Sequence, residues 1–177
     1  MRVIAGTLKG RNFDSPHSHK THPMSEKMRG ALFNVLGDIN NLTIFDAYGG
    51  SGAIAFEAIS RGASKALITE LDVSVAKIIK NNINSLDVSD KVRLIRANAA
   101  SYSKNYPYKH FDLVICDPPY DSIHPTQIIQ LANNVKPNGL LIISKPTGSA
   151  DFDLENFDLE LKKVYGDGTL IFYRKKY

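Results

Sequence analysis

Apolar positions follow two different spacings along the chain. Between residues 28 and 36 they recur every three or four residues, the period of an amphipathic helix, with Ser25 placed to cap its start and Gly37 to end it. From residue 42 onward, short apolar runs alternate with stretches of helical spacing. The expected strands are 42–45, 65–69, 92–95, 111–116 and 140–143, and the expected helices are 53–60, 73–86 and 126–135. This alternation predicts βαβ units and therefore a mostly parallel sheet with right-handed crossovers.

Both ends of the chain break this rhythm. Between residues 2 and 13, β-branched and apolar residues with two glycines predict a short hairpin. Near the other end, Gly166-Asp167-Gly168 separates segments 159–164 and 169–173, a pattern typical of an antiparallel hairpin. We therefore expect an α/β fold with a mostly parallel sheet, a C-terminal antiparallel hairpin and a small N-terminal β-hairpin.

Composition limits the class of protein. The chain has 177 residues, 43% apolar and 23% charged, which suits one soluble globular domain. Its one cysteine, Cys116, excludes an internal disulfide and a cysteine-based zinc cluster, and its place in an apolar strand predicts a core residue. No apolar run approaches the roughly 18 residues of a membrane span, and the first residues do not resemble a signal peptide. We expect a cytoplasmic protein with neither a membrane partner nor a bound metal.

The net charge of +4 is confined to the first 30 residues. This stretch holds six basic side chains and two acidic ones, whereas residues 31–177 are neutral overall. The basic residues are Arg2, Lys9, Arg11, Lys20, Lys27 and Arg29. A basic segment on a neutral body favours an arm at residues 1–22 that binds phosphate groups, ahead of a main domain at residues 23–177. A solvated N-terminus without a ligand is the alternative.

A glycine-rich turn joins the first core strand to the following helix. Gly50-x-Gly52-x-x-Ala55 meets the loose dinucleotide fingerprint, and Glu70 ends the next strand, where an acid that binds ribose would lie. This pattern predicts a cofactor that carries a nucleoside. Asp46, just before the turn, suits the cationic methionine end of S-adenosylmethionine (AdoMet) better than the pyrophosphate of NAD. A glycine turn needed only for packing is the other interpretation.

Asp117-Pro118-Pro119-Tyr120 directly follows the apolar strand that ends at Cys116. The prolines end the strand, and they place the Asp117 carboxylate, the Pro118 carbonyl and the Tyr120 ring at the edge of the sheet. An exocyclic base amine is a poor nucleophile because its lone pair is delocalised into the ring. Two acceptors can hold both of its N–H bonds and turn the lone pair toward an electrophile, while an aromatic ring stacks on the base. The alternative is a strand that ends in prolines, with a capping Asp and a surface Tyr.

These motifs resemble those of a known family over almost the full length of the chain. Asp117-Pro118-Pro119-Tyr120 is similar to the amino-methyltransferase motif of class I AdoMet-dependent enzymes. More narrowly, the chain resembles the RsmD-type bacterial 16S ribosomal RNA guanine-N2 methyltransferases. The matching stretches are 2–6, 9–11, 23–36, 45–52, 57–63, 117–120 and 165–174.

The resemblance implies a Rossmann-like class I methyltransferase sheet and a set of site residues. The cofactor-binding residues would be Asp46, Tyr48, Gly50, Gly52, Glu70, Asn98, Ala99 and Asp117. The target guanine would be held by the catalytic residues Asp117, Pro118, Pro119 and Tyr120. The stretch 23–34 would help to close the cofactor site. The substrate would be ribosomal RNA or a partly assembled small ribosomal subunit, and nothing in the sequence requires more than a monomer.

The chain departs from the family pattern at three places, one of which is Ala47-Tyr48, where a small aliphatic or Phe-Ala pair is usual. His22-Pro23-Met24 stands where Arg-Pro-Thr is usual, and Lys145 stands where an acidic residue is common.

Two other functions also fit some of the motifs. One is an amino-methyltransferase for adenine N6 or cytosine N4, and the other is a nicotinamide-dependent oxidoreductase, which leaves Asp117 to Tyr120 unexplained. Because the glycine turn and Asp117 to Tyr120 lie in the neutral part of the chain, we expect the basic arm to bind the RNA.

Overall fold

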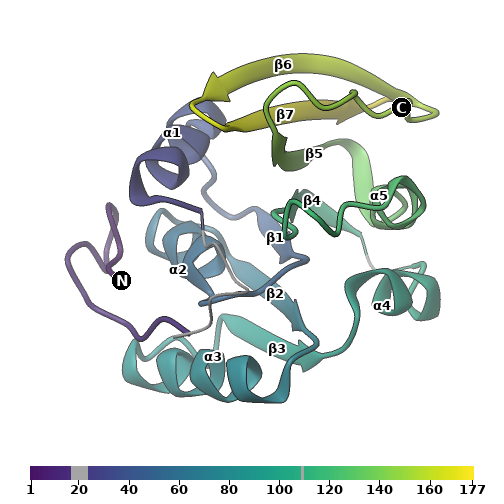
Figure 1. Cartoon of the computed structure of the whole chain (residues 1–177). Helices are drawn as coiled ribbons and strands as arrows, with labels where there is room; N and C mark the ends of the chain where they lie inside the picture. Colours follow the sequence, from purple (N-terminus) through teal and green to yellow (C-terminus); the bar gives the residue numbers. More distant parts are fainter. Residues whose placement is uncertain (17–23, 109) are drawn as a thin grey trace.

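The computed structural model describes residues 1–16, 24–108 and 110–177. Its centre is a seven-stranded sheet with the strand order β3-β2-β1-β4-β5-β7-β6 (Figure 1). The strands are β1 Thr43–Asp46, β2 Lys65–Glu70, β3 Val92–Arg96, β4 Phe111–Cys116, β5 Val135–Pro146, β6 Phe157–Tyr165 and β7 Gly168–Lys175. Strands β1 to β5 are parallel, and β7 pairs antiparallel with both β5 and β6. The expected mostly parallel α/β sheet with a C-terminal antiparallel hairpin is confirmed.

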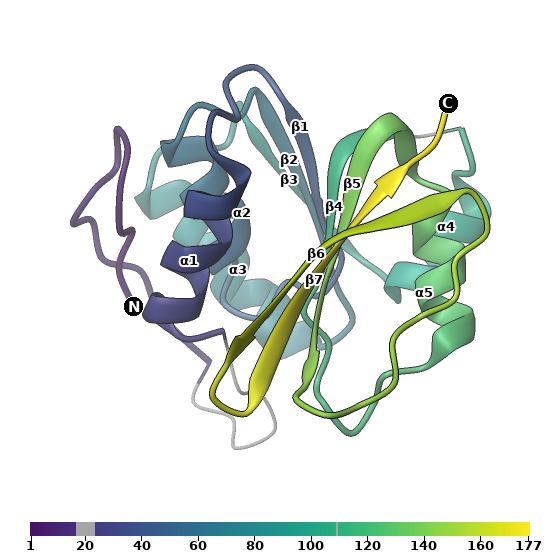
Figure 2. The same cartoon turned by 90° about the horizontal axis from the view of Figure 1, so that it is seen from above.

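Helices cover both faces of this sheet. They are α1 Glu26–Leu36, α2 Ala53–Ser60, α3 Val73–Ser85, α4 Ala99–Asn105 and α5 Pro125–Ala132. Helices α1, α2 and α3 lie on one face, and α4 and α5 lie on the other (Figure 2). The predicted cap of α1 is confirmed, because the Ser25 hydroxyl accepts a hydrogen bond from the Met28 N–H at 3.1 Å. Gly37 follows the helix with a φ of 67°, a conformation that favours glycine.

Three elements differ from their prediction. Helix α4 was not predicted, because its seven residues are too few to show a helical period. Strand β5 begins at Val135, which is the last residue of the predicted helix 126–135. It runs for twelve residues because its N-terminal part pairs with β4 at Phe111. The N-terminal hairpin is reduced to one isolated antiparallel bridge between Arg2 and Asn12.

The strand order reverses between β1 and β4, which sets the place of a ligand site. Both strands point the same way, while the connections that follow them run to opposite faces of the sheet, so a crevice opens beyond their carboxyl ends.

Phe45 on β1 packs edge-on against Tyr102 of α4 at 5.4 Å between ring centroids, and Cys116 is fully buried as predicted. None of the helices in the described ranges is long and apolar enough to cross a membrane.

Candidate active site

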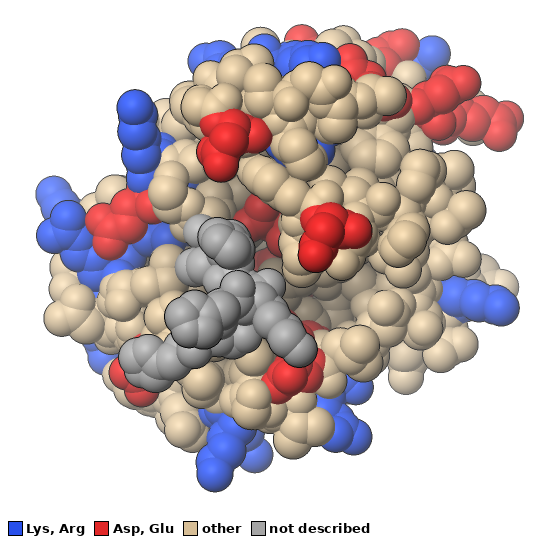
Figure 3. All heavy atoms as spheres, in the orientation of Figure 1, with Lys and Arg blue, Asp and Glu red and all other residues tan. Residues whose placement is uncertain are grey.

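A cavity of about 250 Å³ opens at the carboxyl edge of the sheet. Its walls come from the segments that follow β1, β2, β3 and β4, together with Met24 just before α1. Figure 3 looks onto this edge, where acidic side chains lie in and around the central hollow and most Lys and Arg side chains lie toward the margins. Six of the residues predicted to bind the cofactor line the cavity: Tyr48, Gly50, Glu70, Asn98, Ala99 and Asp117. A parallel sheet therefore brings together residues that are up to 69 positions apart in the sequence, from Tyr48 to Asp117.

The glycine turn forms one wall, and Glu70 holds it in place. The Gly50 N–H donates a hydrogen bond to Oε2 of Glu70 at 3.1 Å. The other carboxylate oxygen of Glu70 accepts from the Asp72 N–H at 2.8 Å. Gly52 does not line the cavity, but it has a φ of 81° and a Cβ there would lie 2.5 Å from the Phe56 ring. The turn therefore needs glycine at position 52 for both its backbone conformation and its packing.

Asp46, at the end of β1, is the least compensated charge of the site. Its side chain is fully buried, only the backbone N–H groups of Ala55 and Tyr48 favour its ionised form, and the interactions described for it include no cation. Burial raises the pKa of Asp46 well above its usual value, and the nearby carboxylates of Asp117 and Glu70 raise it further. A buried carboxylate of this kind is stabilised by a cation. Asp46 does not itself line the cavity, but Asp117 and Glu70 do, so the acidic groups at this edge fit a ligand that carries a positive charge, as the methionine end of AdoMet does.

Asn98 and Ala99 form the wall that follows β3. The Asn98 side chain caps α4, since its oxygen accepts a hydrogen bond from the Ser101 N–H at 3.1 Å. The Ala97 N–H donates to the backbone oxygen of Glu70 at 3.1 Å, which ties this wall to the end of β2. An adenosine group that reached from Glu70 to Asn98 would thus lie against backbone held by main-chain hydrogen bonds.

Asp117 and Tyr120 form the opposite end of the site. Burial raises the pKa of Asp117 to about 6, although hydrogen bonds from the Ser144 hydroxyl and the Met24 N–H favour the ionised form. Pro118 is buried, whereas Pro119 and Tyr120 are exposed. The Tyr120 hydroxyl lies 3.3 Å from the Ser144 hydroxyl. Asp117 and Pro119 line the cavity, whereas Pro118 and Tyr120 do not.

Two residues outside the predicted catalytic set hydrogen-bond Asp117, and sequence reasoning missed one of them, Ser144. Met24 falls in the stretch 23–34 expected to close the cofactor site, and it lines the cavity. Ser144 is 2% exposed and directly follows the fully apolar run 140–143. A polar residue at the end of a buried strand was the available signal for Ser144, but only the pairing of β4 with β5 shows what it contacts.

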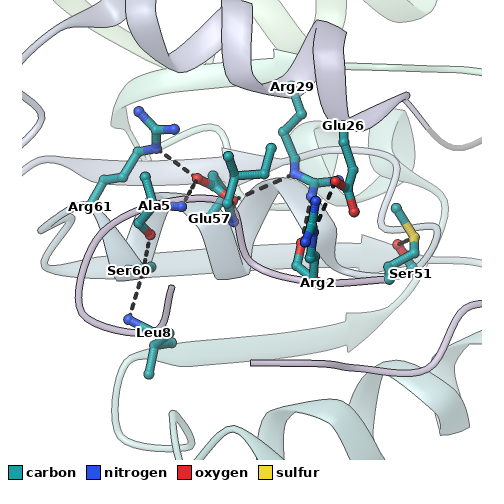
Figure 4. Close-up of polar contacts among 11 residues, drawn as sticks. Arg2, Ala5, Leu8, Glu26, Arg29, Ser51, Glu57, Ser60 and Arg61 are labelled. Atoms are coloured by element: carbon teal, nitrogen blue, oxygen red, sulfur yellow. Dashed lines mark hydrogen bonds and ion pairs between the residues drawn. The ribbon is translucent and has the colours of Figure 1, made fainter. Parts of the chain in front are cut away.

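The basic residues of the N-terminal segment do not form one surface. The expectation that Arg29 binds RNA is wrong, because its side chain is fully buried: Nη2 donates to the Arg2 backbone oxygen at 2.7 Å and Nε lies 3.7 Å from Glu57 (Figure 4). Arg11 donates to the backbone oxygens of residues 85 and 86. Arg2 pairs with Glu26 at 3.2 Å.

The remaining basic residues of this segment are Lys9, Lys20 and Lys27. Lys9 and Lys27 are exposed. Lys20 lies outside the described residues, as do His22 and Pro23. The phosphate-binding interpretation of the segment therefore depends mainly on Lys9 and Lys27, together with the exposed Arg2.

Lys145, another departure from the family pattern, has a structural role. Its side chain is 1% exposed, and its ammonium group donates to the backbone oxygens of Ser149 and Ala150 and pairs with Asp151 at 2.8 Å. These bonds fold residues 147–151 back onto the end of β5. Lys145 is thus an anchor for this loop.

Comparisons with known proteins agree with this geometry. The model of the family described as Conserved hypothetical protein 95 matches residues 1–174. Ribosomal RNA small subunit methyltransferase D from Haemophilus influenzae is 32% identical over 174 residues, covering 94% of this chain and 89% of that protein. The protein of the same name from Buchnera aphidicola is 30% identical over 166 residues, covering 92% and 86%.

Solved structures show the same fold over the whole length. A putative methyltransferase from Escherichia coli matches with a TM-score of 0.87 at 26% identity, covering 99% of this chain and 98% of that chain. A putative methylase from Haemophilus influenzae matches with a TM-score of 0.79 at 29% identity, with the same coverage of 99% and 98%. The family predicted from the motifs is confirmed, and this chain belongs to the RsmD-type family described as Conserved hypothetical protein 95.

Proposed function

We propose that this protein transfers one methyl group from AdoMet to the exocyclic N2 amine of a guanine in small-subunit ribosomal RNA. The proposal depends on one observation: the buried carboxylate of Asp46, whose described interactions include no cation, lies at the same sheet edge as Asp117 and Tyr120. A site for a cation next to an acceptor and a ring is what transfer of a methyl group from a sulfonium to a base amine requires. The relatives named for ribosomal RNA methylation support RNA as the substrate class.

The cofactor would occupy the cavity between the glycine turn and α4. When bound, AdoMet supplies an electrophilic methyl group. Asp46 would compensate its cationic methionine end, Glu70 would accept hydrogen bonds from the ribose hydroxyls, and Asn98 and Ala99 would border the adenine. Each Glu70 oxygen already accepts one backbone N–H and retains a second lone pair for a hydroxyl.

The target base would lie between Asp117 and Tyr120. The Asp117 carboxylate and the Pro118 carbonyl would accept the two N–H bonds of the amine, which directs the nitrogen lone pair at the methyl group. The Asp117 carboxylate, which would accept one of these N–H bonds, would also be placed to take the proton that the amine loses on methylation. Proximity and orientation supply most of the rate enhancement in such a site. Since the amine is inaccessible within stacked RNA, the base has to leave its stack first.

RNA binding would combine the site with the exposed part of the N-terminal segment. We assign Arg2, Lys9 and Lys27 to phosphate contacts, and we retain Lys20 as a proposal because it lies outside the described residues. Arg11 could contribute only if it exchanged its backbone acceptors for phosphate. A chain of this size suits recognition of RNA shape or of a partly assembled small subunit by a monomer.

Nucleoside mass spectrometry of small-subunit ribosomal RNA, with and without the gene, tests the proposal. We expect N2-methylguanosine to be lost without the protein and restored by the wild type. The variant Asp117→Ala should bind AdoMet normally in calorimetry but fail to restore the modification. Loss of N6-methyladenosine or N4-methylcytidine instead would assign the activity to a different base amine. Binding of NAD in place of AdoMet would overturn the cofactor assignment.

A further inference from the structure

Ser144 lies at the carboxyl end of β5, between the β4 strand that leads to Asp117 and the β7 strand. Its register partner on β7 is Leu170, and its side chain is 2% exposed. Ser144 does not line the cofactor cavity. Its hydroxyl is therefore buried next to the target end of the site and away from the cofactor end.

The Ser144 hydroxyl contacts both side chains proposed to hold the base. It hydrogen-bonds the Asp117 carboxylate, and its oxygen lies 3.3 Å from the Tyr120 hydroxyl. A serine hydroxyl has one proton to donate and two lone pairs to accept with. Because an ionised carboxylate only accepts, Ser144 donates to Asp117 and accepts from Tyr120. The three groups form a directed chain, from Tyr120 to Ser144 to Asp117.

We propose that Ser144 is a positioning residue, whose one hydroxyl holds both the amine-accepting Asp117 and the base-stacking Tyr120 in their working orientations. The inference rests on the proposed function of Asp117 and Tyr120. Ser144 itself would touch neither the base nor the cofactor. Its effect would pass through the orientation of the two side chains and through the charge on the carboxylate.

The charges around Asp117 explain why this hydrogen bond matters. The ionisable groups described as interacting with Asp117 are Asp46 from β1, Cys116 from β4 and Tyr120, and none of them is a cation. Asp167, on the β6–β7 turn, faces Tyr120 and adds another negative charge to this end of the site. The hydrogen bonds from Ser144 and from the Met24 N–H are therefore the interactions that favour ionised Asp117. Removing the Ser144 hydroxyl should raise the pKa of Asp117.

The test compares Ser144→Ala and Ser144→Thr with the control Ser103→Ala. Thr keeps the hydroxyl at a strand position that favours β-branched residues. Ser103 is also a buried serine, but its hydroxyl has no hydrogen-bond partner in the described part of the chain. The readouts are AdoMet affinity and the pH profile of single-turnover methyl transfer to ribosomal RNA. Each profile is normalised to its own plateau, so that a smaller fraction of folded protein in one variant does not change the midpoint.

We expect the acid limb of the profile for Ser144→Ala to move up by about one pH unit, which makes transfer about fivefold slower at pH 6 and about tenfold slower at pH 5 and below. Ser144→Thr should keep the wild-type midpoint of the acid limb, and Ser103→Ala should keep both this midpoint and the wild-type rate of methyl transfer. AdoMet affinity should be unchanged in all three. An unshifted midpoint in Ser144→Ala, or the same shift in Ser144→Thr, would overturn the positioning role. Activity retained by Asp117→Ala would overturn the proposed function instead.

Discussion

Nε of Arg29 lies 3.7 Å from Oε2 of Glu57, and both side chains are fully buried between α1 and α2. Glu57 also accepts hydrogen bonds from the N–H groups of Ile4 and Ala5 at 2.8 and 3.1 Å, and it pairs with Arg61 at 2.8 Å (Figure 4). One carboxylate thus joins the N-terminal segment, α1 and α2. Since Met24, next to α1, lines the cofactor cavity, this buried network also supports the site.

Glu57→Gln should strongly destabilise the fold. The substitution leaves the buried Arg29 cation without its counter-charge, and breaking a buried pair from one side costs about 3–5 kcal/mol. Chemical denaturation followed by circular dichroism measures the loss. Arg2→Gln is the control, because its pair with Glu26 is exposed and should contribute less than about 1 kcal/mol. Equal losses of unfolding free energy in the two variants would contradict the conclusion that the buried Glu57 pair stabilises the fold.

Gly168→Ala should reduce activity much more than stability. A Cβ at position 168 would collide with the Tyr120 hydroxyl and lie 3.2 Å from Cε of Met28. Because the tyrosine tip can move aside, we expect a change in unfolding free energy within about 1 kcal/mol, while displacement of the ring slows methyl transfer by about tenfold or more. Gly30→Ala on α1 is the control, since its Cβ would be 3.8 Å from the nearest atom. Normal turnover by Gly168→Ala would show that the Tyr120 position is not critical.

Asp46→Asn should have opposite effects on stability and on cofactor binding. Without AdoMet, the change removes a buried carboxylate that has backbone N–H groups but no cation to compensate its charge, so stability at pH 7 should rise by about 1 kcal/mol. AdoMet affinity should fall by about 10–100-fold, as expected for loss of a charged interaction. Asp112→Asn should instead destabilise the fold, because hydrogen bonds from Thr43 and Lys136 lower the pKa of Asp112. Unchanged AdoMet affinity in Asp46→Asn would remove Asp46 from the cofactor site.

Asp117 should make the AdoMet-free protein less stable as pH rises from about 4 to about 6. Its pKa in the folded state is about 6, above the usual 3.8 of an aspartate, so the folded protein binds a proton more tightly than the unfolded chain does. The stability gained at low pH is therefore lost as pH passes through the folded pKa. The measurable quantity is the difference in unfolding free energy between wild type and Asp117→Asn, which should decrease across this range. A difference that does not vary with pH would mean that Asp117 titrates as it does in the unfolded chain.

Charge removal at Lys9 and Lys27 should weaken RNA binding without affecting AdoMet. We expect the double variant Lys9→Gln, Lys27→Gln to bind ribosomal RNA less tightly and to show a salt dependence reduced by about two phosphate contacts. Lys104→Gln on α4, across the sheet, is the matched control (Figure 2). Deletion of residues 1–20 is unsuitable, because Val3 and Phe13 are part of the core. Wild-type affinity and salt slope in the double variant would favour a solvated segment without a ligand.

Much of the site could be predicted because its signals are local. The alternation of strands and helices predicts parallel strands, and parallel strands bring their carboxyl ends to one edge. Asp46, Glu70 and Asp117 all lie at or directly after such ends, so the pattern alone predicts that they lie at one edge of the sheet. The short polar helix α4 and the early start of β5 were missed, since neither has a periodic signal of its own.

The sequence by itself determined the fold class, the family and the residues at the ends of the strands, because periodicity and motif spacing are properties of neighbouring positions. Only the tertiary structure decided which charges are surface charges and what each buried hydroxyl contacts. Arg29 appeared to belong with the exposed basic residues, but it is buried because Glu57, 28 residues away on another helix, supplies its counter-charge. Ser144 contacts Asp117 and Tyr120 because β5 pairs with β4, and that contact is long-range along the chain.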